Sequence, residues 1–257
     1  MFSFFKKKEK TSRPVPTYHV PDFSFLGGDM HSHLVPGIDD GSQSLEDSIA
    51  FIGKLSDLGL KKFITTPHIH GEMYDNDTRK VQQYFQPLRD YLAAHRPDLS
   101  IQVSAEYFLD TYFLNQVLPK GLMAFGHNNV LVEVSMAGWN RQFKEIMFAV
   151  QANGYNPILA HPERYLYETD MNVFAALKDK GVSLQMNLLS ILGYYGKSIK
   201  ITAEKMLAMG LYDYCGTDLH HNRHLAHISN MPAEQQEIMW QLSEYKFKNK
   251  DLYPEIS

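Results

Sequence analysis

The sequence lacks the features that mark several common protein classes. It contains a single cysteine, Cys215, which excludes an internal disulfide framework and suits a reducing compartment. No apolar run approaches the roughly 20 residues that a membrane-spanning helix needs. The formal net charge is only −4 at pH 7, so there is no electrostatic reason to expect nucleic acid as a partner. We therefore expect a globular, cytoplasmic protein.

Motifs for two other kinds of site are also absent. The chain has no G-x-G-x-x-G and no Walker-type loop, which removes the reason to invoke a nucleotide cofactor. A phosphatase that uses a thiolate needs an arginine six residues after its cysteine, and His221 stands there instead. Cys215 is therefore predicted to be a buried strand residue without a chemical role.

The length of 257 residues suits one large domain, since α/β barrels commonly reach this size. Residues 1–27 contain several prolines and little periodicity, so we expect an extended arm there and one domain over residues 28–257. Lys6–Lys8 follow a very short apolar patch, the reverse of a signal peptide. These lysines leave membrane proximity open, and a mobile tail is the simpler interpretation.

The rest of the chain alternates between strand and helix patterns. Strands are predicted up to His33 and over 62–66, 101–104, 130–132, 157–160, 182–186 and 212–216. Helices are predicted between Ser44 and Gly59, over about 78–95 with an interruption at Pro87, between 106 and 130, and over 141–152, 171–180, 202–209 and 233–246. Right-handed crossovers place the C-terminal ends of parallel strands on one side. We therefore expect an α/β protein, either a parallel barrel or an open sheet.

The most informative stretch is residues 29–41, which read D-M-H-S-H-L-V-P-G-I-D-D-G. On an extended segment His31 and His33 point to the same face, because side chains alternate across a strand. A Pro-Gly turn follows, and Asp40 comes within the same short loop. An isolated H-x-H is as readily a surface pair, so the other strand ends decide between the two interpretations.

Six of the seven predicted strands end in a histidine or a carboxylate. The candidate metal ligands are His31, His33, Asp40, His68, Glu106, Glu133, His161, Asp218 and His220. Nine ligands are more than one ion needs, so the set suits two or three divalent cations. It includes no thiolate and is rich in imidazole, which favours manganese, iron or zinc over calcium. A water between such ions has a lowered pKa and attacks as hydroxide, which indicates hydrolysis.

Two arginines narrow the class of bond that is cut. Arg164 comes three residues after His161, and Arg223 three residues after His220. A guanidinium suits a phosphate dianion because it donates two parallel hydrogen bonds. Phosphate esters are therefore the leading substrate class, with Arg164, Arg223 and Asp40 as candidate catalytic residues; the alternative is that either arginine is a solvated loop residue.

Other histidines and aromatic residues receive a structural interpretation. The remaining histidines are His19, His70, His95, His127, His221, His224 and His227. Of these, His70 and His221 lie next to proposed ligands in sequence and are the two that can orient a ligand. Tyr107, Phe108, Trp139, Tyr194 and Tyr195 follow strands and either flank an aromatic substrate or pack at the rim.

Taken together, these motifs resemble the PHP (polymerase and histidinol phosphatase) superfamily and, within it, the manganese-dependent bacterial protein tyrosine phosphatases of the CpsB/CapC/YwqE type. The matching motifs are the 29–41 stretch, T-T-P-H at 65–68, Glu106, V-E-V at 132–134, A-H-P-E-R-Y at 160–165 and T-D-L-H at 217–220. They occur in the family's order and cover about residues 28–225.

The resemblance implies a distorted (β/α)7 TIM-like barrel with a trinuclear metal site. It assigns one metal to His31, His33, Glu106 and Asp218, a second to Glu106, Glu133 and His161, and a third to Asp40, His68 and His220. It also implies that Arg164 contacts phosphate and that the substrate is phosphotyrosine on a tyrosine autokinase that controls capsule or exopolysaccharide production. Tyrosinate leaves with a pKa near 10, which suits modest activation.

The chain departs from the family at two places. Family members usually begin almost at D-x-H-x-H, whereas nearly thirty residues precede it here, and Arg223 comes slightly early relative to the expected arginine. Two other functions stay open. One is a phosphoesterase acting on a small molecule such as histidinol phosphate or a nucleotide, and the other is a metal-bound, non-catalytic interaction module. The sequence does not fix the oligomeric state.

Overall fold

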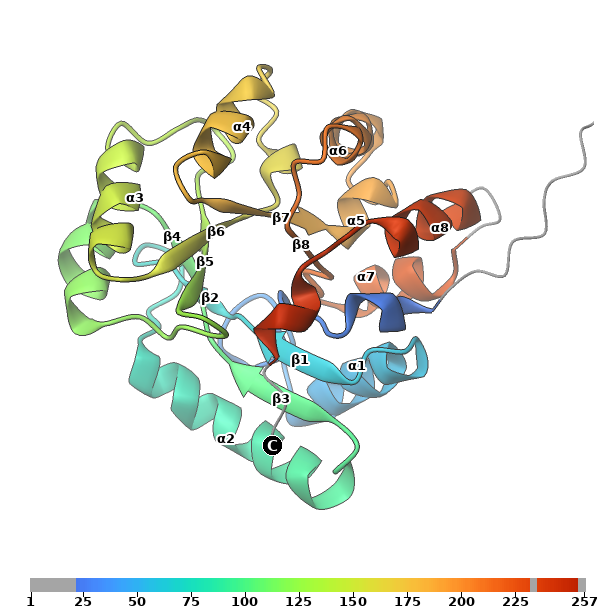
Figure 1. The fold of residues 1–257 in the computed structure, drawn as a ribbon. Helices are drawn as coiled ribbons and strands as arrows, with labels where there is room; N and C mark the ends of the chain where they lie inside the picture. Colours follow the sequence, from blue (N-terminus) through green and yellow to red (C-terminus); the bar gives the residue numbers. More distant parts are fainter. Residues whose placement is uncertain (1–21, 232–234, 254–257) are drawn as a thin grey trace, which may run out of the picture.

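The computed structural model describes residues 22–231 and 235–253 and contains two parallel sheets. Six strands form one sheet in the order β2-β4-β5-β6-β7-β8, and β1 pairs with β3. The strands are β1 (Lys62–Thr65), β2 (His68–Ile69), β3 (Ser100–Val103), β4 (Glu106–Phe108), β5 (Asn129–Glu133), β6 (Asn156–Ala160), β7 (Ser183–Asn187) and β8 (Tyr214–Gly216). The helices lie around the outside of the strands (Figure 1).

Two predicted strands are each divided into two. Thr66 and Pro67 separate β1 from β2, and Ser104 and Ala105 separate β3 from β4. Both runs continue in the same direction, because the backbone N–H of Ser104 donates to Thr65 O at 2.9 Å and that of Glu106 donates to Pro67 O at 3.0 Å. The eight strands therefore correspond to six of the seven that the sequence predicts.

The seventh predicted strand, which ends at His33, is not a regular strand. It makes only two isolated bridges, Asp29 with Phe63 on one side and Ser32 with Leu219 on the other. Side chains replace part of the ladder, since Thr65 Oγ1 accepts from the N–H of Leu34 at 2.9 Å. These bridges nevertheless join β1 to the segment after β8 and close the ring, which confirms the distorted (β/α)7 barrel.

The helices also differ from the prediction in places. They are α1 (Leu45–Asp57), α2 (Thr78–His95), α3 (Phe143–Ala152), α4 (Asn172–Lys178), α5 (Leu188–Ile191), α6 (Lys197–Ala208), α7 (Asn222–Ser229) and α8 (Gln236–Glu244), with a π-helical turn (Phe113–Val117) and 3₁₀ turns between them. The predicted interruption at Pro87 is wrong, because α2 runs through it. Pro87 lies on the exposed face, where water can satisfy the carbonyl that loses its partner. The helices α5 and α7 were not predicted.

Part of the predicted N-terminal arm is packed rather than extended. Phe23–Leu26 form a 3₁₀ turn, and Phe23 and Leu26 are both 1% exposed. The boundary expected at residue 27 therefore falls after a packed segment, and residues 1–21 lie outside the described part of the chain. Within that described part, no helix has both the length and the apolar character needed to cross a bilayer.

The interior of the barrel is closed at the end opposite the strands' C-termini. Alternate side chains of the strands, such as Leu131 and Ile158, form a separate apolar cluster with Leu252 and Tyr253. The C-terminal segment that carries these two residues lies across the strands in Figure 1. The outward-facing residues belong to the larger core under the helices. This packing leaves the C-terminal ends of the strands as the open end of the barrel.

Candidate metal centre

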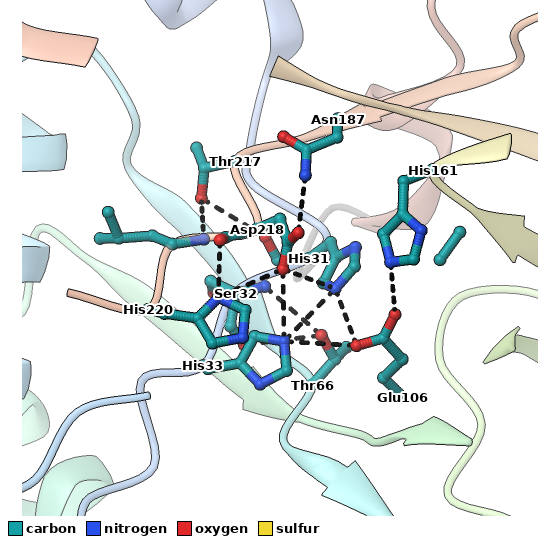
Figure 2. Close-up of polar contacts among 12 residues, drawn as sticks. His31, Ser32, His33, Thr66, Glu106, His161, Asn187, Thr217, Asp218 and His220 are labelled. Atoms are coloured by element: carbon teal, nitrogen blue, oxygen red, sulfur yellow. Dashed lines mark hydrogen bonds and ion pairs between the residues drawn. The ribbon is translucent and has the colours of Figure 1, made fainter. Parts of the chain in front are cut away.

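The structure brings the nine candidate ligands together at this end of the barrel. They come from the bridged segment and the loop after it (His31, His33, Asp40), from β2, β4 and β5 (His68, Glu106, Glu133), and from the residues just after β6 and β8 (His161, Asp218, His220). Most of them are drawn in Figure 2, where their side chains point toward one another. Convergence of strand ends, which the sequence predicts, therefore occurs.

Four buried atoms form the tightest group. His31 Nε2 lies 3.2 Å from Glu106 Oε2 and 3.3 Å from Asp218 Oδ1, and His33 Nε2 lies 3.4 and 3.5 Å from the same two oxygens. The two imidazole Nε2 atoms are 3.4 Å apart. Ligands about 2.1 Å from a tetrahedral ion are separated by about 3.4 Å. The spacing and chemistry of these donors therefore fit a divalent cation.

Two further groups share a residue with the first, one through Glu106 and the other through His33. His161 Nε2 lies 3.1 Å from Glu106 Oε1 and 4.0 Å from Glu133 Oε2. His68 faces two ways: its Nδ1 is 3.2 Å from Glu133 Oε1, and its Nε2 is 3.6 Å from Asp40 Oδ1. His220 Nε2 is also 3.6 Å from Asp40 Oδ1. The resemblance assigned His68 to the third metal alone, whereas the structure groups it both with Asp40 and His220 and with Glu106 and Glu133.

Electrostatics favour charged carboxylates in this centre. Burial raises the pKa of Glu106, but the charge of His31 and hydrogen bonds from His161 and His31 outweigh it and hold the pKa well below the usual value. Asp218 behaves in the same way, with His31 and His220 as the main opposing charges to burial. Burial lowers the pKa of His31, and Glu106 and Asp218 together raise it to about 9. In the metal-free protein, protonated imidazoles therefore balance the buried carboxylates, and a bound cation would take the place of those protons.

Sequence reasoning missed Asp39, which supports the centre. Its Oδ2 accepts from His33 Nδ1 at 2.8 Å and from the backbone N–H of His68 at 3.0 Å. This arrangement fixes the His33 ring so that Nε2 faces the group of four, in the way that carboxylates orient metal-bound histidines. A signal was available, since Asp39 directly precedes Asp40 in the D-D-G motif.

Two amides of β7 were also missed. Gln185 Oε1 lies 3.0 Å from His31 Nδ1, and Asn187 Nδ2 donates to Asp218 Oδ2 at 2.6 Å. The predicted strand at 182–186 is the one without a terminal histidine or carboxylate. The sequence signal for a role at this strand was the pair of amide side chains in a mainly apolar run. Amides in a buried strand need hydrogen-bond partners.

The backbone is strained or tightly packed at the ligands. His161 and Asp218 have φ values of 35° and 50°, a region that residues other than glycine rarely adopt. A Cβ atom on Gly41 would lie 2.2 Å from His33 O, and one on Gly216 would lie 2.5 Å from His31 Cβ. The close approach of these chain segments therefore requires glycine at both positions, and strain of this kind is typical of functional sites.

The two candidate arginines occupy different places. Arg164 Nη1 lies 3.1 Å from Asp218 Oδ2, and its guanidinium lies over the Tyr195 ring at 4.5 Å from the centroid. Arg164 lines the cavity above the ligands. Arg223 is exposed on the first turn of α7 and is not among the described residues that line this cavity. A catalytic role for Arg223 stays a prediction without support from its position.

The cavity has a volume of about 610 Å³ and contacts several of the other predicted residues. Its lining includes His70, His221, His224, Phe108 and Tyr195. His224 Nδ1 accepts from the backbone N–H of His220 at 3.3 Å, so it supports a proposed ligand, although it was interpreted as structural. Trp139 instead donates to Glu168 among the outer helices, Tyr107 is in the core, and His19 lies outside the described residues.

Cys215 lies on β8 and is fully buried. Burial, together with the charges of Asp29 and Glu163, raises the pKa of its thiol well above the usual value. A thiol in this state is a poor nucleophile at neutral pH. The structure therefore confirms that Cys215 is a buried strand residue.

Comparison with known proteins agrees with this geometry. The chain is 24% identical over 194 residues to the tyrosine-protein phosphatase YwqE of Bacillus subtilis, covering 75% of this chain and 76% of the relative. It is 27% identical over 199 residues to the tyrosine-protein phosphatase CpsB of Streptococcus pneumoniae, covering 75% and 82%. A structure described under crystal structures of these two metal-dependent tyrosine phosphatases has a TM-score of 0.71, with 22% identity over 86% of this chain and 89% of that one.

A family model described as "Capsular polysaccharide synthesis, CpsB/CapC" matches residues 28–234. This match includes all nine candidate ligands, Asp39, both β7 amides and Arg164. It also includes most of the strands and helices that build the barrel. The chain therefore belongs to the CpsB/CapC family.

Proposed function

We propose that this protein is a metal-dependent phosphoric monoester hydrolase that removes phosphate from phosphotyrosine in proteins. The observation that carries the proposal is the buried, closely spaced group of His31, His33, Glu106 and Asp218 with Arg164 beside it. Relatives named tyrosine-protein phosphatases support the substrate class. We further propose a bacterial tyrosine autokinase that controls capsule or exopolysaccharide production as the substrate, a cytoplasmic location, and residues 28–257 as the catalytic domain.

The donor atoms support three divalent cations, with manganese preferred and iron or zinc as alternatives. The proposed ligand sets are His31, His33, Glu106 and Asp218 for the first ion, Glu106, Glu133 and His161 for the second, and Asp40, His68 and His220 for the third. When bound, such ions lower the pKa of a coordinated water and neutralise charge on phosphate oxygens.

The chain's own residues bind and orient the substrate. The guanidinium of Arg164 lies at the cavity wall and contacts Asp218 through Nη1. A guanidinium has five N–H groups, so it can keep this contact and still donate two hydrogen bonds to a phosphate. The ring of Tyr195 lies against that guanidinium and limits its motion. Asp39, Gln185 and Asn187 hold three ligands in place by hydrogen bonds. Catalytic roles for Asp40 and Arg223 remain part of the proposal.

The test is phosphate release from tyrosine-phosphorylated peptides after chelation and after addition of manganese, zinc or iron. We expect chelation to abolish turnover and manganese to restore it. His31→Ala and Asp218→Ala should each abolish turnover, whereas His95→Ala should not, because His95 is an exposed histidine on α2. Faster hydrolysis of histidinol phosphate or a nucleotide would replace the protein substrate with a small molecule. No phosphate release with any of the metals would support a non-catalytic interaction module.

A further inference from the structure

The cavity above the candidate metal centre has two unlike sides. Arg164, Tyr195 and His220 line it from the segments that follow β6, β7 and β8. Met73, Phe108 and Met136 line it from β4 and from the segments that follow β2 and β5. We call these last three residues the apolar wall. Arg164 thus lies on one side, and the apolar wall lies on the other, beside polar residues such as His70 and Ser135.

Topology places the three residues of the apolar wall on neighbouring segments. Strands β2, β4 and β5 are neighbours in the sheet, so the segments at their C-terminal ends lie side by side. Phe108 is held by a ring contact with His70 at a centroid distance of 3.9 Å. A tight turn holds Met73, because the N–H groups of Met73 and Tyr74 both donate to His70 O, at 3.1 and 2.8 Å.

The two methionines of the apolar wall are exposed. Met73 is 67% exposed and Met136 is 44% exposed. Both flank Phe108 at a cavity that holds the candidate metal centre, rather than lying singly on the outer helices. Methionine side chains adapt to differently shaped apolar groups and are common on peptide-binding surfaces. The wall therefore offers apolar contact without demanding one shape.

The cavity lining offers an acidic neighbour of the phosphate few basic partners. Among the described residues that line the cavity, Arg164 is the single lysine or arginine, and it already faces Asp218. A glutamate or aspartate next to the phosphorylated residue would find no lysine or arginine partner there, whereas an apolar side chain would find the wall.

We propose that the apolar wall binds the side chain next to phosphotyrosine, so that the enzyme prefers phosphotyrosine sites with large apolar neighbours. This inference rests on the proposed function and adds a substrate class to it. The cavity volume of about 610 Å³ is large enough to hold phosphotyrosine and part of a neighbouring side chain. Phosphate lies at Arg164, and the adjacent residue packs on Met73, Phe108 and Met136.

The experiment compares kcat/KM for three peptides of equal length in which phosphotyrosine is flanked on both sides by leucine, serine or glutamate, together with free phosphotyrosine. For the wild type we expect leucine to exceed glutamate by about tenfold, the scale of one modest apolar contact. In the double variant Met73→Gln, Met136→Gln the loss on the leucine peptide should exceed the loss on free phosphotyrosine by about fivefold. The matched control is Met209→Gln, since Met209 is 45% exposed and lies after α6 away from this cavity.

Each other outcome overturns the inference. No preference in the wild type, or a preference for glutamate, would exclude an apolar neighbour without relying on any variant. Equal losses on free phosphotyrosine and on the leucine peptide would mean that the wall contacts the substrate's own ring. If the wild type hydrolysed neither the peptides nor free phosphotyrosine with any metal, the proposed function itself would fail, and that result is distinct from a loss of preference.

Discussion

His33 Nδ1 and Asp39 Oδ2 are 2.8 Å apart, and both side chains are fully buried. This contact sets the orientation of His33, because the opposite ring nitrogen then faces Glu106 and Asp218. The same Asp39 oxygen accepts from the N–H of His68 at 3.0 Å. One carboxylate therefore couples two ligand-bearing segments, the bridged segment before the loop and β2.

Replacing Asp39 with asparagine should weaken metal binding more than folding. The amide keeps the shape of the side chain but loses the charge that faces the His33 ring. We expect a loss of about 10–100-fold in manganese affinity, as is typical when the orienting partner of a metal-bound histidine is removed. Calorimetric titration of the metal-free protein measures the affinity. Asp98→Asn, which changes an exposed carboxylate paired with Arg96, is the control; equal affinities in both variants would remove the orienting role.

Arg164→Lys should reduce kcat/KM on phosphotyrosyl peptide by about 10–100-fold, mainly through KM. Lysine keeps the charge but loses the planar fork and the stacking on Tyr195. Tyr195→Phe should retain more activity than Tyr195→Leu, because phenylalanine preserves the ring under the guanidinium. Steady-state kinetics of the three variants check the order. A lysine variant with an unchanged KM would argue against phosphate binding by Arg164.

Cys215→Ala should keep most of the activity. The thiol is buried on β8, and its pKa is raised well above the usual value by burial and by Asp29 and Glu163. Loss of a small buried group should lower the free energy of unfolding by about 1 kcal/mol. Turnover and thermal unfolding measure the two effects, and iodoacetamide should not inactivate the native wild type. Inactivation by this reagent at one cysteine per chain would contradict the assignment.

The sequence predicts that the candidate ligands lie together because these residues stand at or near strand ends. His68 and Glu106 begin the short strands β2 and β4, and Glu133 ends β5, so the barrel topology brings them together near the C-terminal ends of the strand runs. The alternation of His31 and His33 needs only an extended backbone, and two isolated bridges suffice for that. Local pattern and global fold agree at these positions.

Features that depend on tertiary contacts were not predictable in the same way. The contacts of His68 with both Asp40 and Glu133 follow from ring orientation, which sequence spacing does not specify. Pro87 is tolerated because it happens to face solvent on α2. Arg223 comes soon after His220, but α7 begins between them and leaves it exposed. Spacing along the chain predicts proximity only where the backbone remains extended or turns in a known way.

Asp213 gives a pH-dependent prediction outside the metal centre. Its carboxylate pairs with Lys178 and with Lys248 Nζ at 2.8 Å, and it accepts from the N–H of Leu184 at 3.1 Å. Burial raises its pKa, but the hydrogen bonds from Lys178 and Lys248 outweigh that effect and the net pKa is lowered. A carboxylate whose folded pKa is depressed stabilises the fold above its unfolded pKa of about 4, and this contribution is lost as the pH falls further.

Asp213→Asn should therefore lower the free energy of unfolding by about 1 kcal/mol at pH 7. We expect no larger effect, because the two lysines are partly exposed and solvent weakens their attraction to Asp213. The difference from the wild type should shrink as the pH falls from about 5 to 3, because the wild-type carboxylate then also loses its charge. Urea unfolding of metal-free protein across this range, with Asp90→Asn as the control for an exposed carboxylate, measures the trend. A difference that stayed constant with pH would show that hydrogen-bond geometry, rather than charge, accounts for the role of Asp213.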